Sequence, residues 1–89
     1  MIRRDLKLTN RLGLHARAAS KLVQTASQFD AEVWLERDSR RVNAKSIMGV
    51  LMLAAPCGAE LVLEVDGPDE EKAVEALAGL IERRFGEDE

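Results

Sequence analysis

The segment LVLEVDGPDEEKAVEALAGLIERRF, residues 61–85, contains the local pattern that determines the fold. Leu61, Leu63 and Val65 alternate with their neighbours, which predicts a β-strand. After a turn over 66–69, apolar residues recur at helical spacing, so an amphipathic helix is predicted. We expect Asp69 to cap this helix and Gly86 to end it. Its expected buried positions are Ala73, Val74, Leu77, Leu80, Ile81 and Phe85.

Strands and amphipathic helices are also predicted in the rest of the chain. The patterns predict strands over 2–8, 32–37 and 40–43, a helix over 16–27, and a short helix that begins after Ser46 and ends at Pro56 and Gly58. The order is therefore β-α-β-β-α-β-α. Because each amphipathic element needs a partner for its apolar face, we predict an α+β fold of the open-faced sandwich type. In this fold we expect a four-stranded antiparallel sheet that is covered on one face by three helices.

Length and composition favour one soluble domain over residues 1–89, because 89 residues cannot supply two cores. Hydrophobic residues make up 46% and charged residues 33%, which argues against a disordered chain. The longest uncharged apolar stretch, 50–57, has eight residues, against roughly 20 for a membrane-spanning helix. MIRRDLKLTN lacks the apolar region of a secretory signal, and Cys57 is the single cysteine. We therefore expect a cytoplasmic protein without membrane insertion, in which Cys57 is an inert thiol of a loop or the core.

The two halves of the sequence differ in charge. Residues 1–45 contain ten Lys and Arg against five Asp and Glu, whereas residues 46–89 contain three against eleven. A basic half can attract nucleic acid, phosphorylated groups or an acidic protein surface. Nucleic acid is the weaker interpretation, because aromatic residues make up 3% and the basic residues are not clustered. Alternatively, interleaved elements average the charge over the surface.

His15 is the only histidine, and the pattern places it at the start of the first helix. A helix N-terminus has unpaired amides and partial positive charge, so it can bind an anion. The amides of Ala16, Arg17 and Ala18 and the Arg17 guanidinium would form a phosphoryl cradle around an imidazole, which is nucleophilic near pH 7. By itself, the pattern also fits a solvated helix cap. One His and one Cys are too few ligands for a zinc site, so no metal is expected.

Ser46 in NAKSIMGV is the second candidate residue. Its simplest role is to cap the short helix. It can also be a regulatory phosphosite, because a helix N-terminus tolerates a phosphate that changes the surface potential. Ile47, Met48 and Leu51 either form an exposed apolar patch for partners or belong to the core. We expect at least Met48 to be exposed, because a short helix cannot bury every side.

Two motifs carry a resemblance to a known family. GLHARAAS at 13–20 and KSIMGV at 45–50, in this element order, closely resemble HPr, the histidine-containing phosphocarrier family of the bacterial phosphoenolpyruvate-dependent phosphotransferase system. The resemblance implies a cofactor-free stoichiometric carrier, not an enzyme. His15 would accept a phosphoryl group on Nδ1 from enzyme I and pass it to an enzyme IIA domain, and Arg17 would contact that group. Ser46 matches the serine that HPr kinase/phosphorylase modifies in many relatives.

The resemblance leaves the branch of the system open. Many members have proline where this chain has Ala18, and alanine or threonine where it has Ser20. GLHARAA also resembles the nitrogen-branch phosphocarriers, whose partners are regulatory. A purely regulatory binding module that works through Ser46 is a further alternative. We expect partner contacts at Ala16, Arg17, Ser20, Ile47, Met48 and Leu51, and a monomer that binds its partners transiently.

Overall fold

The computed structural model describes residues 1–86 and has the α+β architecture that the sequence predicts. Its elements are β1 (Ile2–Lys7), α1 (Ala16–Ala26), β2 (Glu32–Arg37), β3 (Arg40–Asn43), α2 (Ile47–Met52), β4 (Glu60–Asp66), α3 (Glu70–Glu82) and the 3₁₀ turn η1 (Arg84–Gly86). Residues 87–89, the last part of the domain expected over 1–89, lie outside the described residues.

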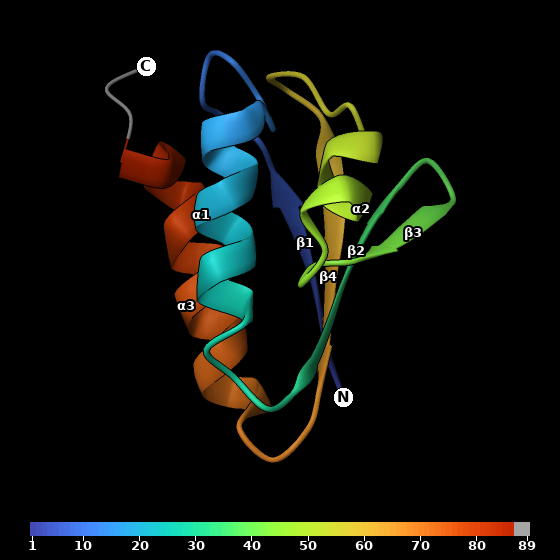
Figure 1. Cartoon of the computed structure of the whole chain (residues 1–89), viewed down its shortest axis with the longest axis vertical. Coiled ribbons are helices and arrows are strands. Elements are labelled where there is room, and N and C mark those ends of the chain that lie inside the picture. The colour runs from blue at the N-terminus through green and yellow to red at the C-terminus, as the bar shows by residue number, and fades with distance from the viewer. Residues whose placement is uncertain (87–89) are drawn as a thin grey trace.

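The four strands form one antiparallel sheet in the order β1-β4-β2-β3. Leu63 on β4 lies opposite Arg4 on β1 and Leu35 on β2, so β4 is flanked on both sides. Figure 1 shows α1 and α3 running antiparallel, side by side, with α2 near the end of the sheet where α1 begins. The expected open-faced sandwich, with three helices over a four-stranded sheet, is confirmed.

The core lies between the sheet and the helices. Its largest fully buried side chains include Leu35 of β2, Leu63 of β4, Leu22 of α1 and Leu77 of α3. Burial of each such side chain contributes about 1.5–3 kcal/mol. On α3 the predicted stripe is confirmed except that Ala78 is buried, whereas Leu80 is only partly buried against the core.

The opposite face of the sheet has a polar surface. The guanidinium of Arg41 on β3 lies 4.4 Å from the ring centroid of Trp34 on β2. Arg41 also forms an ion pair with Glu64 of β4, at 3.2 Å. These three side chains therefore contact one another on the open face, opposite the face that the helices cover.

Both ends of α3 differ in part from the prediction. Asp69 is the N-cap residue, as expected, but its side chain makes no capping hydrogen bond to α3. Its two carboxylate oxygens instead accept hydrogen bonds from the amides of Asp30 and Ala31, both at 2.9 Å. Asp69 thus joins the start of α3 to the loop after α1, a long-range contact that local spacing does not indicate. The helix also ends at Glu82, before Gly86, because Arg84 and Phe85 have positive φ angles of 56° and 57°.

The Asp69 contacts predict a pH-dependent stability. The hydrogen bond from the Asp30 amide, supported by the one from Ala31, lowers the pKa of Asp69 from its ordinary value of 3.8. A lowered pKa in the folded state stabilises the fold above the unfolded value, and this contribution is lost as the pH falls through the folded pKa. We expect the urea concentration at the unfolding midpoint to decrease when the pH is lowered below about 4, where the unfolded Asp69 begins to bind a proton.

Asp69→Asn should lower the urea midpoint at pH 7 and make it less sensitive to acid. The asparagine amide group offers one acceptor oxygen, so one of the two backbone amides loses its partner. Glu75→Gln is the matched control, because Glu75 is an exposed carboxylate on the same helix. Equal midpoints and equal acid sensitivity for the two variants would contradict the role of Asp69.

Candidate functional site

The loop between β1 and α1 holds His15 at one end of the molecule. The side-chain amide of Asn10, which is fully buried, donates to the Gly13 carbonyl at 2.7 Å. The Gly13 amide donates back to the Asn10 carbonyl at 3.2 Å, and the Leu14 amide donates to the Ala55 carbonyl at 2.9 Å. These bonds fix the backbone up to the residue before His15. The predicted strand over 2–8 and helix over 16–27 leave a connection here, but the sequence analysis missed the structural role of Asn10.

Gly13 is required where this loop meets the segment after α2. Its φ is +64°, and a Cβ at this position would lie 2.3 Å from the Ala55 carbonyl oxygen and 2.8 Å from the Pro56 Cα. Only a residue without a side chain fits this close approach. The His15 loop and the segment around Ala55 therefore contact each other directly through their backbones.

His15 is the N-cap residue of α1, as the sequence predicts. Its φ of −74° and ψ of 175° are extended, and its imidazole makes no capping hydrogen bond to the helix. The Ala19 amide donates to the His15 carbonyl at 2.8 Å, which is the first bond of the helical ladder. The three preceding amides, those of residues 16–18, come before that ladder at the positive end of the helix dipole. Such an end can stabilise an anion next to the imidazole.

The other predicted cradle and contact residues on α1 differ in exposure. Ala16 and Arg17 are exposed, and Ser20 is half-buried, with its hydroxyl accepting a hydrogen bond from Gln24 at 3.3 Å. Ala18 is fully buried, so its side chain belongs to the core and only its amide is relevant to an anion. Arg17 is the exposed cation of the first helical turn.

Ser46 is the N-cap of α2, and its expected capping bond is present. The Ser46 hydroxyl accepts a hydrogen bond from the Gly49 amide at 3.2 Å. The helix ends at Met52, before Pro56 and Gly58, where the sequence led us to expect its end. Leu53 is the C-cap and Ala54 has a positive φ of 48°, so the backbone leaves the helical conformation early.

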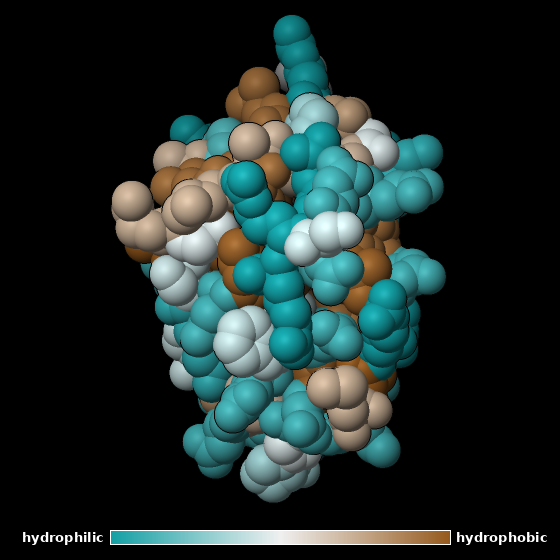
Figure 2. All heavy atoms as spheres, turned by 90° about the vertical axis from the view of Figure 1, so that its right-hand side faces the viewer, coloured by the Kyte–Doolittle hydropathy of each residue, from teal (hydrophilic) through white to brown (hydrophobic). Residues whose placement is uncertain are grey.

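Most of α2 is exposed on its outer side. The exposed fractions are 39% for Ile47, 68% for Met48 and 36% for Leu51, so these residues are not core, and the expected exposure of Met48 is confirmed. Met52, 59% exposed, continues the surface, and we call these four residues the α2 patch. Figure 2 shows apolar side chains gathered in the upper part of the face seen from the side of β3, where α2 lies in Figure 1.

Leu12 is a further exposed apolar residue that the sequence analysis missed. It lies three positions before His15 and is 64% exposed. An isolated leucine in the polar stretch TNRLG fits neither strand nor helix periodicity, and that mismatch was the available signal. α2 packs against α1, so the α2 patch and the start of α1 belong to neighbouring elements.

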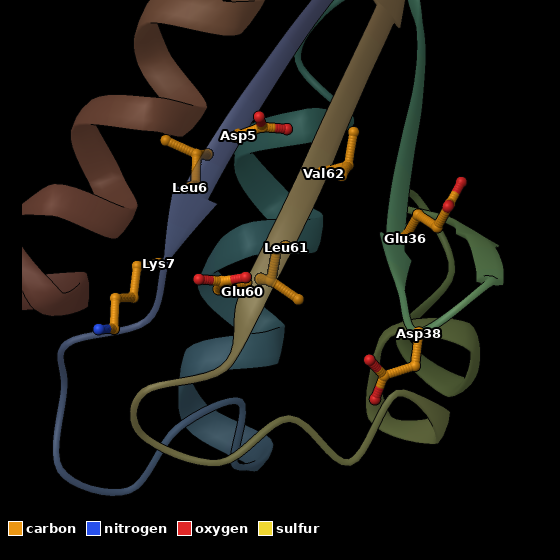
Figure 3. Close-up of a pocket in the computed structure, with 8 residues that line it drawn as sticks. All are labelled: Asp5, Leu6, Lys7, Glu36, Asp38, Glu60, Leu61 and Val62. Atoms are coloured by element: carbon orange, nitrogen blue, oxygen red, sulfur yellow. The ribbon is translucent and has the colours of Figure 1, made fainter.

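A hollow elsewhere on the molecule does not contain His15. It has a volume of about 490 Å³, and its charged lining residues are Asp5, Lys7, Glu36, Asp38 and Glu60. Figure 3 shows these side chains spread over β1, β4, β2 and the turn after β2. A surface with four carboxylates and one ammonium group disfavours a phosphate. The candidate site therefore remains the His15 end of α1.

Other chemistry finds little support in the described part of the chain. Within residues 1–86, no three His, Cys, Asp or Glu side chains come together in a way that could hold a metal ion. Cys57 is exposed, so its expected position in a loop is confirmed and a core position is excluded. None of the helices described is long and apolar enough to cross a membrane.

Comparison with known proteins gives consistent similarities. Residues 2–83 match the family model described as PTS HPr component phosphorylation site. The chain is 55% identical to phosphocarrier protein HPr of Cupriavidus necator over 89 residues, which is 100% of both chains. A crystal structure of HPr-C-His from Thermoanaerobacter tengcongensis matches with a TM-score of 0.97 and 46% identity over 100% of both chains. That of an HPr dimer from the same organism matches with a TM-score of 0.79 and 49% identity, over 92% of this chain and 94% of that one.

Proposed function

The chain belongs to the HPr family, the phosphocarriers of the phosphotransferase system, and we propose that His15 is the residue that carries its phosphoryl group. In this proposal Nδ1 of His15 takes the group from phosphorylated enzyme I and passes it to an enzyme IIA domain. The bond between the donor and phosphorus breaks as a phosphorus–nitrogen bond forms on His15. In the second transfer the bond on His15 breaks as a bond to the acceptor forms. The carrier is regenerated, and no cofactor takes part.

One observation carries this proposal, namely the position of His15 as the N-cap of α1. His15 directly precedes the backbone amides of residues 16–18, which come before the first helical hydrogen bond, donated by Ala19. These amides and the exposed Arg17 guanidinium supply hydrogen bonds and positive charge for a phosphoryl group attached to the ring. Ala16, Arg17 and Ala18 then form the cradle, with Ala18 contributing only through its backbone.

Partner docking belongs to the same proposal. The exposed side chains of Ala16, Arg17, Ile47, Met48 and Leu51, with Ser20 at their edge, would contact enzyme I and the enzyme IIA domain. A flexible methionine adapts to more than one partner surface, which suits a carrier that visits a donor and an acceptor. The chain would act as a cytoplasmic monomer, although an HPr dimer is among the similar structures. Short-lived contacts suit rapid transfer in both directions.

Regulation at Ser46 is the finer part of the proposal. Phosphorylation by an HPr kinase/phosphorylase would put a double negative charge at the first turn of α2, next to Ile47 and Met48. The fold tolerates this charge at a helix N-terminus, but an acidic partner surface would be repelled by it. Phosphoryl transfer at His15 would then slow without any change in the His15 loop.

Ser46→Asp should lower the rate of phosphoryl transfer from enzyme I by about tenfold, equivalent to roughly 1.4 kcal/mol of interaction. Aspartate keeps a capping oxygen for the Gly49 amide, so the helix is retained while charge is added. Ser46→Asn is the matched neutral control, and it should transfer at the wild-type rate. Equal rates for the aspartate and asparagine variants would exclude a charge effect at this position.

The test of the carrier function is a two-step transfer followed by intact-mass analysis. The wild-type chain is incubated with phosphoenolpyruvate and a bacterial enzyme I, and one acid-labile phosphoryl group should appear. Adding an enzyme IIA domain should then remove it. Absence of labelling, with a known HPr labelled in the same tube, would overturn the proposal and favour the purely regulatory module. Running the second step with sugar-branch and nitrogen-branch acceptors separately identifies the branch.

A further inference from the structure

α2 is too short to hold its own position. It has six residues, and Val50 is its only buried one. Isolated helices of fewer than about 12 residues are marginal in water, so tertiary contacts must place this one. The position of the α2 patch relative to His15 therefore depends on what holds the ends of α2.

Two arginines of the β2–β3 hairpin bind the C-terminal end of α2. Arg40 Nη1 donates to the Met52 carbonyl at 2.9 Å. Arg37 Nη1 donates to the Leu53 carbonyl at 3.0 Å and lies 3.4 Å from the Ala54 carbonyl. The last carbonyls of a helix lack partners within the helix and carry partial negative charge, so guanidinium donors stabilise them. Two cations from one turn thus hold one helix end.

Leu53, the C-cap of α2, is buried in the core, so apolar packing holds the inner side of this helix end and the arginines hold its outer side. Between the hairpin and the end of α2 lies a hollow of about 250 Å³, lined by Arg37, Asp38, Arg40, Met52, Leu53 and Ala54. On this outer side the side chains make few dispersion contacts, so the hydrogen bonds supply the directional contacts between the hairpin and α2. The two arginine side chains reach across this space to the backbone.

The same helix end leads directly to the His15 loop. One residue beyond Ala54, the Ala55 carbonyl accepts the hydrogen bond from the Leu14 amide at 2.9 Å. Leu14 is the residue before His15. The His15 loop is held by this bond and by those between Asn10 and Gly13, none of which involves residues 52–54. A shift of the α2 end therefore moves the α2 patch relative to a His15 loop that keeps its own bonds.

We propose that Arg37 and Arg40 are positioning residues that hold the α2 patch in register with His15, so that one partner meets both surfaces. The part of this inference that concerns transfer rests on the proposed function. Neither arginine needs to touch the phosphoryl group, since both act through the carbonyls of residues 52–54. Their loss should weaken productive docking while leaving the chemistry at His15 intact.

The test compares Arg37→Ala, Arg40→Ala and the double variant with the control Arg41→Ala. Arg41 lies on the same strand as Arg40, but its guanidinium contacts Trp34 and Glu64 on the open face. With phosphorylated enzyme I as donor, we expect the double variant to raise the KM for the carrier by about tenfold and to leave kcat within about twofold. Arg41→Ala should change neither. Arg40→Lys should have a KM closer to that of wild type than to that of Arg40→Ala, because an ammonium group can donate to one carbonyl.

A second measurement, made on the free protein, does not need any transfer activity. Hydrogen exchange of the Val50 and Leu51 amides should be about tenfold faster in the double variant, whereas the amides of α3 should be unchanged. If exchange and KM match those of Arg41→Ala, the proposal is wrong. If exchange is faster but KM is unchanged, the arginines only stabilise α2, and the positioning role is also excluded. If wild type accepts no phosphoryl group, the proposed function fails, while exchange still decides whether the arginines hold α2.

Discussion

A His15→Ala chain should remain folded and accept no detectable phosphoryl group from phosphorylated enzyme I. The variant lacks the only imidazole in the sequence, and no other side chain lies at the N-cap of α1. The amides of residues 16–18 and the Arg17 guanidinium remain, so the anion-binding end of the helix is still present. Without a nucleophile there is no covalent acceptor, and the expected loss is therefore complete rather than partial.

The fold should tolerate this substitution. The imidazole of His15 makes no capping hydrogen bond to α1, and alanine is likewise not a capping residue. We expect the free energy of unfolding to change by less than about 1 kcal/mol. Urea unfolding and intact-mass analysis on the same sample measure both properties.

The His15→Ala variant should also inhibit the phosphorylation of the wild-type chain by enzyme I. The α2 patch and Arg17 are unchanged, so the variant still docks on enzyme I and competes for it. Phosphoenolpyruvate-dependent labelling of His15→Ala at any other residue would show that the acceptor has been assigned wrongly.

Ser46→Ala is the companion variant. It should lose about 1 kcal/mol of stability through loss of the cap but remain a phosphoryl acceptor.

The elements in which apolar residues recur with a clear periodicity could be predicted from the sequence almost to their ends. The strands at 32–37 and 40–43 have the predicted bounds, because Asp38 and Ser39 form the turn between them with positive φ angles of 50° and 71°. The first helix is one residue shorter than predicted, and the fourth strand is one residue longer at each end. Alternation and helical spacing are local properties, so a single sequence contains them.

The errors occur where distant residues decide the local structure. Asp69 has the spacing of a helix cap, but the amides at 30 and 31 compete for its carboxylate and bind it. The last carbonyls of α2 accept hydrogen bonds from Arg37 and Arg40, which precede that helix in sequence and lie in another element. Such contacts follow from the tertiary arrangement, and residue spacing along the chain does not reveal them.

The candidate site was predictable to a similar degree. His15 and Ser46 could be placed at helix starts because a cap is defined by residues next to it in sequence. The extent of the exposed surface was harder, since Leu12 and Met52 are apolar residues that helical or strand spacing does not assign to a surface. The role of Gly13 in fixing His15 also depends on residues 55 and 56, about 40 positions away, and spacing gives no sign of it.

Gly13→Ala should be the most disruptive single-methyl substitution in the His15 loop. An alanine at φ +64° costs about 1–2 kcal/mol of backbone strain. Its Cβ would also lie 2.3 Å from the Ala55 carbonyl oxygen and 2.9 Å from the Pro56 carbonyl carbon, so two backbone segments must separate. Overpacking of this kind adds about 1–3 kcal/mol, and the expected total loss of stability is about 2–5 kcal/mol.

The separation of these two backbone segments should affect phosphoryl transfer as well as stability. The Leu14 amide bonds to the same Ala55 carbonyl, so moving that carbonyl releases the backbone immediately before His15. A misplacement of about 1 Å at a reacting group can slow a reaction about 100-fold, and we expect a loss of at least tenfold in transfer from enzyme I. Rates are measured at a temperature where urea titration shows the variant to be folded.

Gly58→Ala separates backbone strain from the steric clash. Gly58 also has a positive φ, +90°, but a Cβ there would meet nothing within 4 Å. This control should lose only the backbone term, about 1–2 kcal/mol, and should transfer phosphoryl groups at the wild-type rate. If the two alanine variants are equally stable and equally active, then the contact between Gly13 and Ala55 does not position His15. A large loss confined to Gly13→Ala would instead tie phosphoryl transfer to the backbone contact that joins the end of α2 to the start of α1.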